Sequence, residues 1–247
     1  MKQRIICVLN HKGGVGKTTT TLNLGKALNL LGKKVLLIDI DPQANLSQCV
    51  GVEEPEHHVY EAICENSDLP LHIIGPGFYL APSDLSLSRA ELRLQSEVTG
   101  SFKLRNALRR LKEPFDYILI DCPPSLGILT VNALMAAGEV LLVVQSQYLA
   151  IKGLQTILDL MEELKQDLNP QLSVAGLVVT QTNRTVFSKS IEETLRSVYG
   201  GKVFRTAIRQ NVALAEASSA GKDIFDYNPK SSGAEDYHLL ANELLHG

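Results

Sequence analysis

Five continuous apolar runs are spaced along the chain, each followed by polar residues or glycine: 5–9, 35–38, 117–120, 140–144 and 174–179. Continuous runs, unlike alternating ones, are typical of parallel strands buried on both faces. Apolar residues at helical spacing occur between several of them, as in 22–31, 129–137 and 154–168. This alternation predicts one α/β domain over 1–247, with a doubly wound, mostly parallel sheet and helices on both faces.

Two stretches in the first half are less regular. Prolines and glycines interrupt the pattern between 44 and 100, so we expect short helices there and one strand near 71–74. The stretch 85–112 has a helical pattern and predicts a single helix. Its seven basic residues against two acidic ones fit either a solvated helix face or a surface for a polyanionic partner.

Composition narrows the functional classes. The formal charge of −3 over 247 residues gives no overall attraction to nucleic acid, so any polyanion site must be local. The four cysteines are scattered without a C-x-x-C pair, which argues against a zinc site or a disulfide framework. No apolar run approaches the roughly 18–20 residues that cross a bilayer. We therefore expect a cytoplasmic protein.

The stretch 10–20, NHKGGVGKTTT, follows the first strand and leads into a helix, as a phosphate-binding loop does. Its glycines let consecutive N–H groups point inward, and the N-terminus of the helix adds positive potential. Lys17 is expected to reach the β- and γ-phosphates of a nucleotide, and the Thr18 hydroxyl to bind Mg²⁺. The predicted nucleotide contacts are Lys12, Gly13, Gly14, Val15, Gly16, Lys17, Thr18 and Thr19.

Carboxylates follow two other strands. Asp39 and Asp41 come after 35–38, where ligands bind in open α/β sheets, although Asp-Pro is also a common start of a turn. Asp121 follows the run 117–120 and comes shortly before two prolines, which is the Walker B arrangement. We expect Asp121 to hold a water molecule bound to Mg²⁺.

Two features of the loop depart from the usual P-loop pattern, since His11 stands where glycine is expected and Lys12 is an additional lysine. In these features, the chain resembles the ParA/MinD ATPases and their deviant Walker A loop. Together with 39–43 and 121–124, the resemblance is to a ParA-type ATPase and covers essentially the full length. Because no helix-turn-helix segment precedes the first strand, we expect the short, Soj-like form.

The resemblance implies a mechanism. Two subunits would close over two ATP molecules, with Lys12 of each reaching the phosphates of the other subunit's nucleotide. Asp41 would orient the attacking water, while Asp39 and Asp121 support Mg²⁺. Asn183 would contact the adenine. Hydrolysis would be slow until a ParB-like partner stimulates it.

The segment 184–222 has an excess of basic residues, which suits contact with the phosphate backbone of DNA without base reading. We expect non-specific DNA as a partner and association with the nucleoid. In the relatives, an arginine often occurs where this chain has Ala213, which puts the strength of DNA binding in doubt. The predicted DNA contacts are Arg184, Lys189, Arg205, Arg209 and Lys222.

Alternatives remain open at this level. The same DNA-bound ATPase positions protein assemblies in place of chromosome or plasmid DNA, and the sequence does not identify the cargo. A small-molecule kinase or amidoligase shares the phosphate loop, and an iron–sulfur ATPase would need a second well-placed cysteine beside Cys122. The segment 234–247 contains no lysine or arginine, so we expect no membrane binding of the MinD type.

Overall fold

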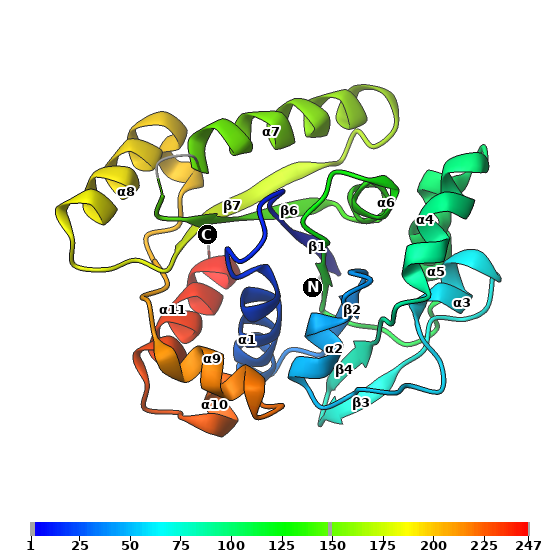
Figure 1. Cartoon of the computed structure of the whole chain (residues 1–247), viewed down its shortest axis with the longest axis horizontal. Coiled ribbons are helices and arrows are strands. Elements are labelled where there is room, and N and C mark those ends of the chain that lie inside the picture. The colour runs from blue at the N-terminus through cyan, green and yellow to red at the C-terminus, as the bar shows by residue number, and fades with distance from the viewer. Residues whose placement is uncertain (1–2, 148–149, 247) are drawn as a thin grey trace.

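A seven-stranded sheet forms the centre of the computed structural model, which describes residues 3–147 and 150–246 (Figure 1). All neighbouring strands are parallel except the first two at one edge, which are antiparallel. Across the sheet, the order is β3 (His72–Gly75), β4 (Phe78–Ala81), β2 (Val35–Asp39), β5 (Tyr117–Asp121), β1 (Arg4–Leu9), β6 (Glu139–Gln145) and β7 (Ser173–Thr180).

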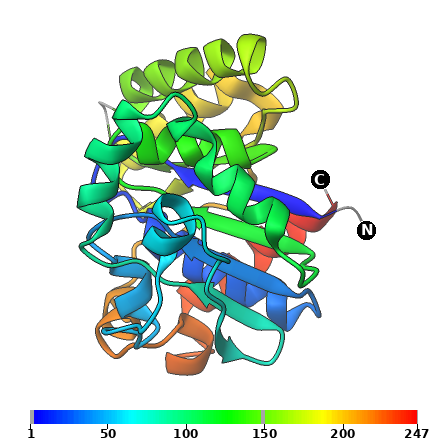
Figure 2. The same cartoon turned by 90° about the vertical axis from the view of Figure 1, so that its right-hand side faces the viewer.

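Helices cover both faces of this sheet (Figure 2), which confirms the predicted doubly wound α/β fold. One face packs against α1 (Lys17–Leu30), α2 (Asn45–Cys49), α9 (Val212–Ser219), α10 (Ile224–Tyr227) and α11 (Ser232–His246). The other packs against α3 (Val59–Cys64), α4 (Leu87–Ser96), α5 (Lys103–Arg110), α6 (Ile128–Ala136), α7 (Ala150–Asp167) and α8 (Val186–Tyr199). Two 3₁₀ turns, η1 (Gly100–Phe102) and η2 (Gly200–Lys202), connect helices.

The central strands are apolar up to their carboxyl ends, since helices cover both of their faces. Every residue of β2 and β5 is buried, and side chains in β1 alternate between the two cores. Helix α1 lies close to the sheet at Gly25, where a Cβ atom would come within 2.6 Å of Leu37 Cδ2. The middle of α1 thus packs directly on side chains of β2, β4 and β5.

The region before β5 differs from the prediction in two places. The single strand expected near 71–74 is a hairpin of β3 and β4, whose four-residue strands are too short to show a clear apolar pattern. The single helix expected over 85–112 is wrong, since α4 ends at Ser96 and α5 begins at Lys103. Between them, Gly100 packs so closely on the carbonyl of Leu94 that no Cβ atom fits there.

Part of the basic excess in this region is neutralised locally. Arg93 and Lys103 both form ion pairs with Glu97, and Arg110 lies 3.9 Å from Asp68.

Within 3–147 and 150–246, no helix has the length and apolar character that a membrane crossing needs.

Candidate active site

The loop between β1 and α1 has the backbone of a phosphate cradle. Gly14 and Gly16 adopt positive φ angles of 73° and 94°, which side chains other than glycine disfavour. Helix α1 begins without a side-chain cap, so the N–H groups of its first turn stay available for an anion. The predicted strand–loop–helix arrangement of 10–20 is therefore present.

Lys17 lies inside this loop and is only 7% exposed. Its Nζ donates a 3.2 Å hydrogen bond to the carbonyl of Lys12, which holds the ammonium group across the mouth of the loop. Burial lowers the pKa of Lys17, and the nearby Asp121 carboxylate opposes that effect. A cation desolvated in this way interacts strongly with an incoming phosphate.

Asp39 and Asp121 meet at the ends of neighbouring strands, where they are paired in the register of β2 and β5. Both are fully buried. Thr18 Oγ1 donates to Asp121 Oδ2 over 2.7 Å, and the backbone N–H and hydroxyl of Ser47 donate to Asp39 Oδ2 over 2.9 and 2.8 Å. The structure thus brings together the three residues predicted to bind the metal.

The electrostatics of this pair favour a bound cation. Burial raises the pKa of Asp39 to about 6, although the hydrogen bonds from Ser47 oppose the shift. Burial, followed by the charge of Asp39, raises the pKa of Asp121 to about 8. A divalent cation would stabilise both carboxylates in their ionised form.

The oxygen ligands at this site suit Mg²⁺, provided that a bound substrate and water supply the remaining ligands. Thr18, Asp39 and Asp121 offer the oxygen ligands that Mg²⁺ prefers. No group of three or more His, Cys, Asp or Glu side chains in the described ranges could hold a metal ion without other ligands. Phosphate oxygens and water would therefore supply the remaining ligands, as is usual for Mg²⁺ at nucleotide sites.

Asp41 lies beside these carboxylates and is held rigidly. Its backbone N–H donates to Asp39 Oδ1 over 3.1 Å, and its carbonyl accepts a 2.7 Å bond from the Ser83 hydroxyl. Its side-chain Oδ1 accepts from the N–H of Gln43 over 2.9 Å. A buried carboxylate fixed in this way is well suited to orienting a water molecule.

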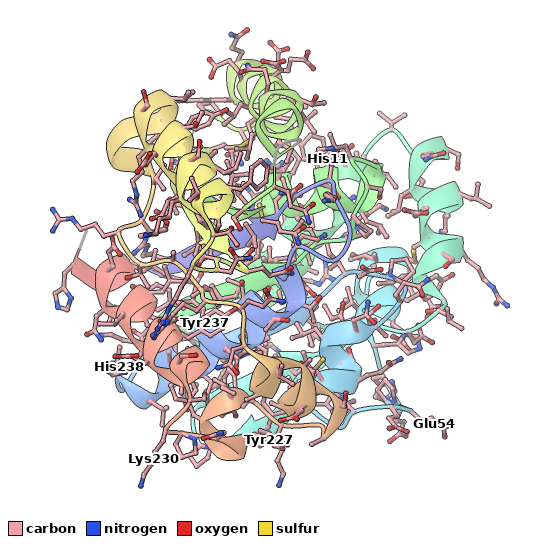
Figure 3. The ribbon with its side chains drawn as sticks, turned by 60° about the vertical axis from the view of Figure 1, so that its left-hand side comes forward. His11, Glu54, Tyr227, Lys230, Tyr237 and His238 are labelled. Carbon is pink, nitrogen blue, oxygen red and sulfur yellow. The ribbon has the colours of Figure 1, made fainter. Side chains whose placement is uncertain are left out.

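A cavity of 230 Å³ opens beside the phosphate loop. Figure 3 shows Tyr237 on α11, whose hydroxyl lies 3.2 Å from Thr20 Oγ1 of the neighbouring α1. Among the described residues, the cavity is lined by Val15, Gly16, Thr19, Thr180, Gln181, Ile208, Arg209, Gln210, Asn211, Leu214, Ala215 and Tyr237.

Asn183, predicted to contact adenine, does not line this cavity. Its Oδ1 accepts bonds from the N–H and hydroxyl of Thr185 at the start of α8. The amide side chains in the cavity wall are those of Gln181, Gln210 and Asn211. Sequence reasoning missed them because β7 and the segment before α9 lie about 30 residues apart and meet only in the folded chain.

The predicted DNA contacts differ in their surroundings. Arg184, Lys189, Arg205 and Lys222 are exposed. Arg209 is also exposed, but its guanidinium is bound to Asp236 Oδ1 and Glu235 Oε2, both at 2.5 Å. Its charge is therefore largely neutralised within the subunit. At the start of α9, Ala213 is buried and the exposed side chain is the apolar Val212.

Comparison with known proteins agrees with this geometry. The AAA_31 family model, described as an AAA domain, matches residues 3–174. The sporulation initiation inhibitor protein Soj of Bacillus subtilis is 40% identical over 98% of both chains. The chromosome partitioning protein ParA of Caulobacter vibrioides is 38% identical over 98% of this chain and 94% of its own.

A solved structure extends the comparison to a bound nucleotide. The structure of cobyrinic acid a,c-diamide synthase from Mycobacterium smegmatis with bound ADP and magnesium has a TM-score of 0.86 and 32% identity. It covers 99% of this chain and 94% of its own. The full-length likeness to Soj and ParA, combined with the phosphate loop and the paired carboxylates, shows that the chain belongs to the ParA/Soj family of Walker-type partition ATPases.

Proposed function

We propose that this protein binds ATP and Mg²⁺, dimerises in that state, binds DNA without sequence preference, and segregates chromosome or plasmid DNA with a ParB-like partner. The observation that carries the proposal is the different placement of the two loop lysines. Lys17 is buried in its own loop, whereas Lys12 is exposed and its ammonium group lies outside the loop. Lys12 thus lies at the surface, from which it would reach phosphates held by a second subunit.

Within one subunit, the chain's own residues would bind and orient the nucleotide. The N–H groups of 13–16 and the Lys17 ammonium would hold the phosphates, with Thr18 and Thr19 at the start of α1. Thr18, Asp39 and Asp121 would hold Mg²⁺, which neutralises phosphate charge. Asp41 would orient the attacking water, and its weak basicity explains why hydrolysis would be slow without a partner.

Dimerisation would be linked to the γ-phosphate. Lys12 crossing to the partner's nucleotide places an ammonium group against phosphate in an interface that excludes water, where the attraction amounts to several kcal/mol. Because the dimer would bind ATP more tightly than the monomer does, ATP would favour the dimer by that difference in affinity. Loss of the terminal phosphate would then release the subunits.

DNA binding would use cations that lie exposed on the surface. Arg184, Lys189, Arg205 and Lys222 are the candidates, and Arg209 contributes less because Asp236 and Glu235 neutralise it. Two copies of this surface in one dimer would bind much more tightly than one copy. Such contacts involve phosphate only and carry no sequence preference.

DNA binding measured with ATP and with ADP, at two salt concentrations, tests the proposal. We expect binding that requires ATP and weakens steeply with salt, because each phosphate contact releases counterions. Equal binding with both nucleotides, or no binding with either, contradicts it.

A second function has one specific observation in its favour. The solved structure named as cobyrinic acid a,c-diamide synthase is 32% identical to this chain. A small-molecule ligase would turn over ATP in response to a metabolite and would be indifferent to DNA. Adding cobyrinic acid and an amide-nitrogen donor to an ATPase assay separates the two functions. Stimulation of ATP hydrolysis by these compounds, with no effect of DNA, favours the ligase.

The same DNA-bound ATPase could also position a protein cargo. A pull-down with the nucleotide-trapped dimer would identify the adaptor protein that connects the ATPase to such a cargo.

A further inference from the structure

Two glutamines after the apolar part of β6 hold the ammonium group of Lys12. Lys12 Nζ donates to Gln145 Oε1 over 3.3 Å and also to Gln147 Oε1. We propose that Gln145 and Gln147 are positioning residues that hold Lys12 on its own subunit and thereby set how readily the ATP-bound dimer forms. This inference rests on the cross-subunit role proposed for Lys12.

The contact belongs to a chain of amides with only one possible direction. Gln145 Nε2 donates to Gln181 Oε1 over 2.6 Å, and Gln181 Nε2 donates to the carbonyl of Gly14 over 2.8 Å. The Gly14 carbonyl can only accept, and the Lys12 ammonium can only donate. Both amides are therefore oriented, with the Gln145 oxygen facing Lys12.

The same network of amides connects Lys12 to the carbonyl groups of the phosphate loop. The hydroxyl of Thr180 donates to the carbonyl of Val15 over 2.7 Å, so the end of β7 holds two successive loop carbonyls. Gln181 adopts a positive φ of 53°, which is uncommon for a residue other than glycine. The strain indicates that the direction of its side chain is maintained by this network.

His11 restrains the loop from the same side. Its ring lies so close to Gly153 in α7 that a Cβ atom there would require the ring to shift. The two residues that depart from the usual loop pattern thus both contact residues outside the loop: Lys12 contacts Gln145 and Gln147, and His11 contacts Gly153.

A contact made by the free subunit and given up in the dimer favours the free subunit. Gln145 and Gln147 offer neutral oxygens, which hold an ammonium group less strongly than a carboxylate does. Lys12 is therefore restrained but releasable. Removing an oxygen should favour the dimer, and adding a charge to it should oppose the dimer.

The first test measures Lys12 in the nucleotide-free full-length protein. Reductive methylation with formaldehyde and a borohydride, followed by mass spectrometry, gives the reaction rate of each lysine. We expect Gln145→Met and Gln147→Met to raise the rate at Lys12 about threefold, in line with the loss of one modest hydrogen bond. Gln155→Met on the exposed face of α7, where the amide binds Asp159, is the matched control and should leave the rate unchanged. Rates equal to the wild type in all variants overturn the proposal.

The second test measures dimerisation by sedimentation with a non-hydrolysable ATP analogue. Gln147→Met should lower the dimer dissociation constant about three- to tenfold, and Gln147→Glu should raise it. Nucleotide affinity of the monomer should stay within about twofold, because among the described residues the Gln147 side chain reaches the phosphate loop only through Lys12. Raised Lys12 rates with an unchanged dimer constant overturn the proposal. A wild type that stays monomeric while the Lys12 rates rise supports the positioning contact and contradicts the proposed ATP-dependent dimer.

Discussion

Thr18 donates a 2.7 Å hydrogen bond to Asp121, and this bond joins the first turn of α1 to the end of β5. The two residues are 103 positions apart in the chain, yet they belong to the same candidate Mg²⁺ site. Thr21 adds a 3.3 Å bond to the other oxygen of Asp121. The carboxylate is thus held in place by α1 before any cation arrives.

Asp121→Asn should stabilise the metal-free protein at neutral and alkaline pH. Because burial raises the pKa of Asp121 to about 8, the folded protein keeps a proton that the unfolded chain has lost. The free energy of unfolding should therefore fall as the pH rises from about 4 towards 8. In Asp121→Asn this fall should be smaller, by up to about 1.4 kcal/mol per pH unit over this range.

Thermal unfolding in the presence of a chelator, at pH 5 and pH 8, measures this difference. ATP with Mg²⁺ should stabilise the wild type but not Asp121→Asn, since the variant lacks the charged ligand. Thr130→Val, which removes a buried hydroxyl outside the site, is a control for general effects of the substitution. An identical pH dependence in wild type and Asp121→Asn would show that Asp121 is not the group that titrates.

Lys12→Ala and Lys17→Ala should separate nucleotide binding from dimerisation. Lys17 is buried in the loop, so Lys17→Ala should lose nucleotide affinity in the monomer. Lys12 is exposed, so Lys12→Ala should keep monomer affinity within about threefold and lose the ATP dimer. Fluorescent nucleotide titration and sedimentation give the two quantities, and a Lys12→Ala variant that still dimerises would remove the cross-subunit role.

Asp41→Ala should trap the ATP-bound dimer. Loss of the residue that orients the water should lower turnover by about 10²-fold or more, while dimerisation persists. Asp41→Asn is the matched second variant, because its amide oxygen can still accept the hydrogen bond from the N–H of Gln43 and so keep the local structure. Phosphate release and sedimentation check both variants; brisk release from either one argues against the water-orienting role.

Arg209→Ala should destabilise the protein as well as alter its surface charge. Asp236 is only 4% exposed and accepts bonds from the Arg209 guanidinium and backbone N–H, so removing the guanidinium leaves a buried carboxylate without its cationic partner. We expect a loss of about 1–3 kcal/mol, less than for a fully buried pair because the Arg209 side chain is 50% exposed.

Lys222→Ala provides the comparison for this effect. It is exposed and should weaken DNA binding and reduce its salt dependence without changing the melting temperature. If the loss of DNA affinity in Arg209→Ala is no larger than its reduced folded fraction explains, Arg209 is a structural residue and not a DNA contact. Unchanged stability in Arg209→Ala would mean that the ion pair with Asp236 contributes little.

The strands and the phosphate loop were predictable because their signals are local. Continuous apolar runs report burial on both faces, and the glycine spacing in 10–20 reports a backbone that only a phosphate cradle requires. The hairpin of β3 and β4 and the break at Gly100 were not predictable, since a short edge strand and a tight packing contact leave no periodic pattern.

The sequence alone determined the parallel α/β fold, the loop that faces phosphate and the acids that end two strands, because each depends on neighbours within about ten residues. Only the tertiary structure decided that burial raises the pKa values of Asp39 and Asp121, that Gln181 and not Asn183 lines the cavity, and that Asp236 neutralises Arg209. Those properties depend on distance and burial between segments far apart in the chain, which a linear pattern does not encode.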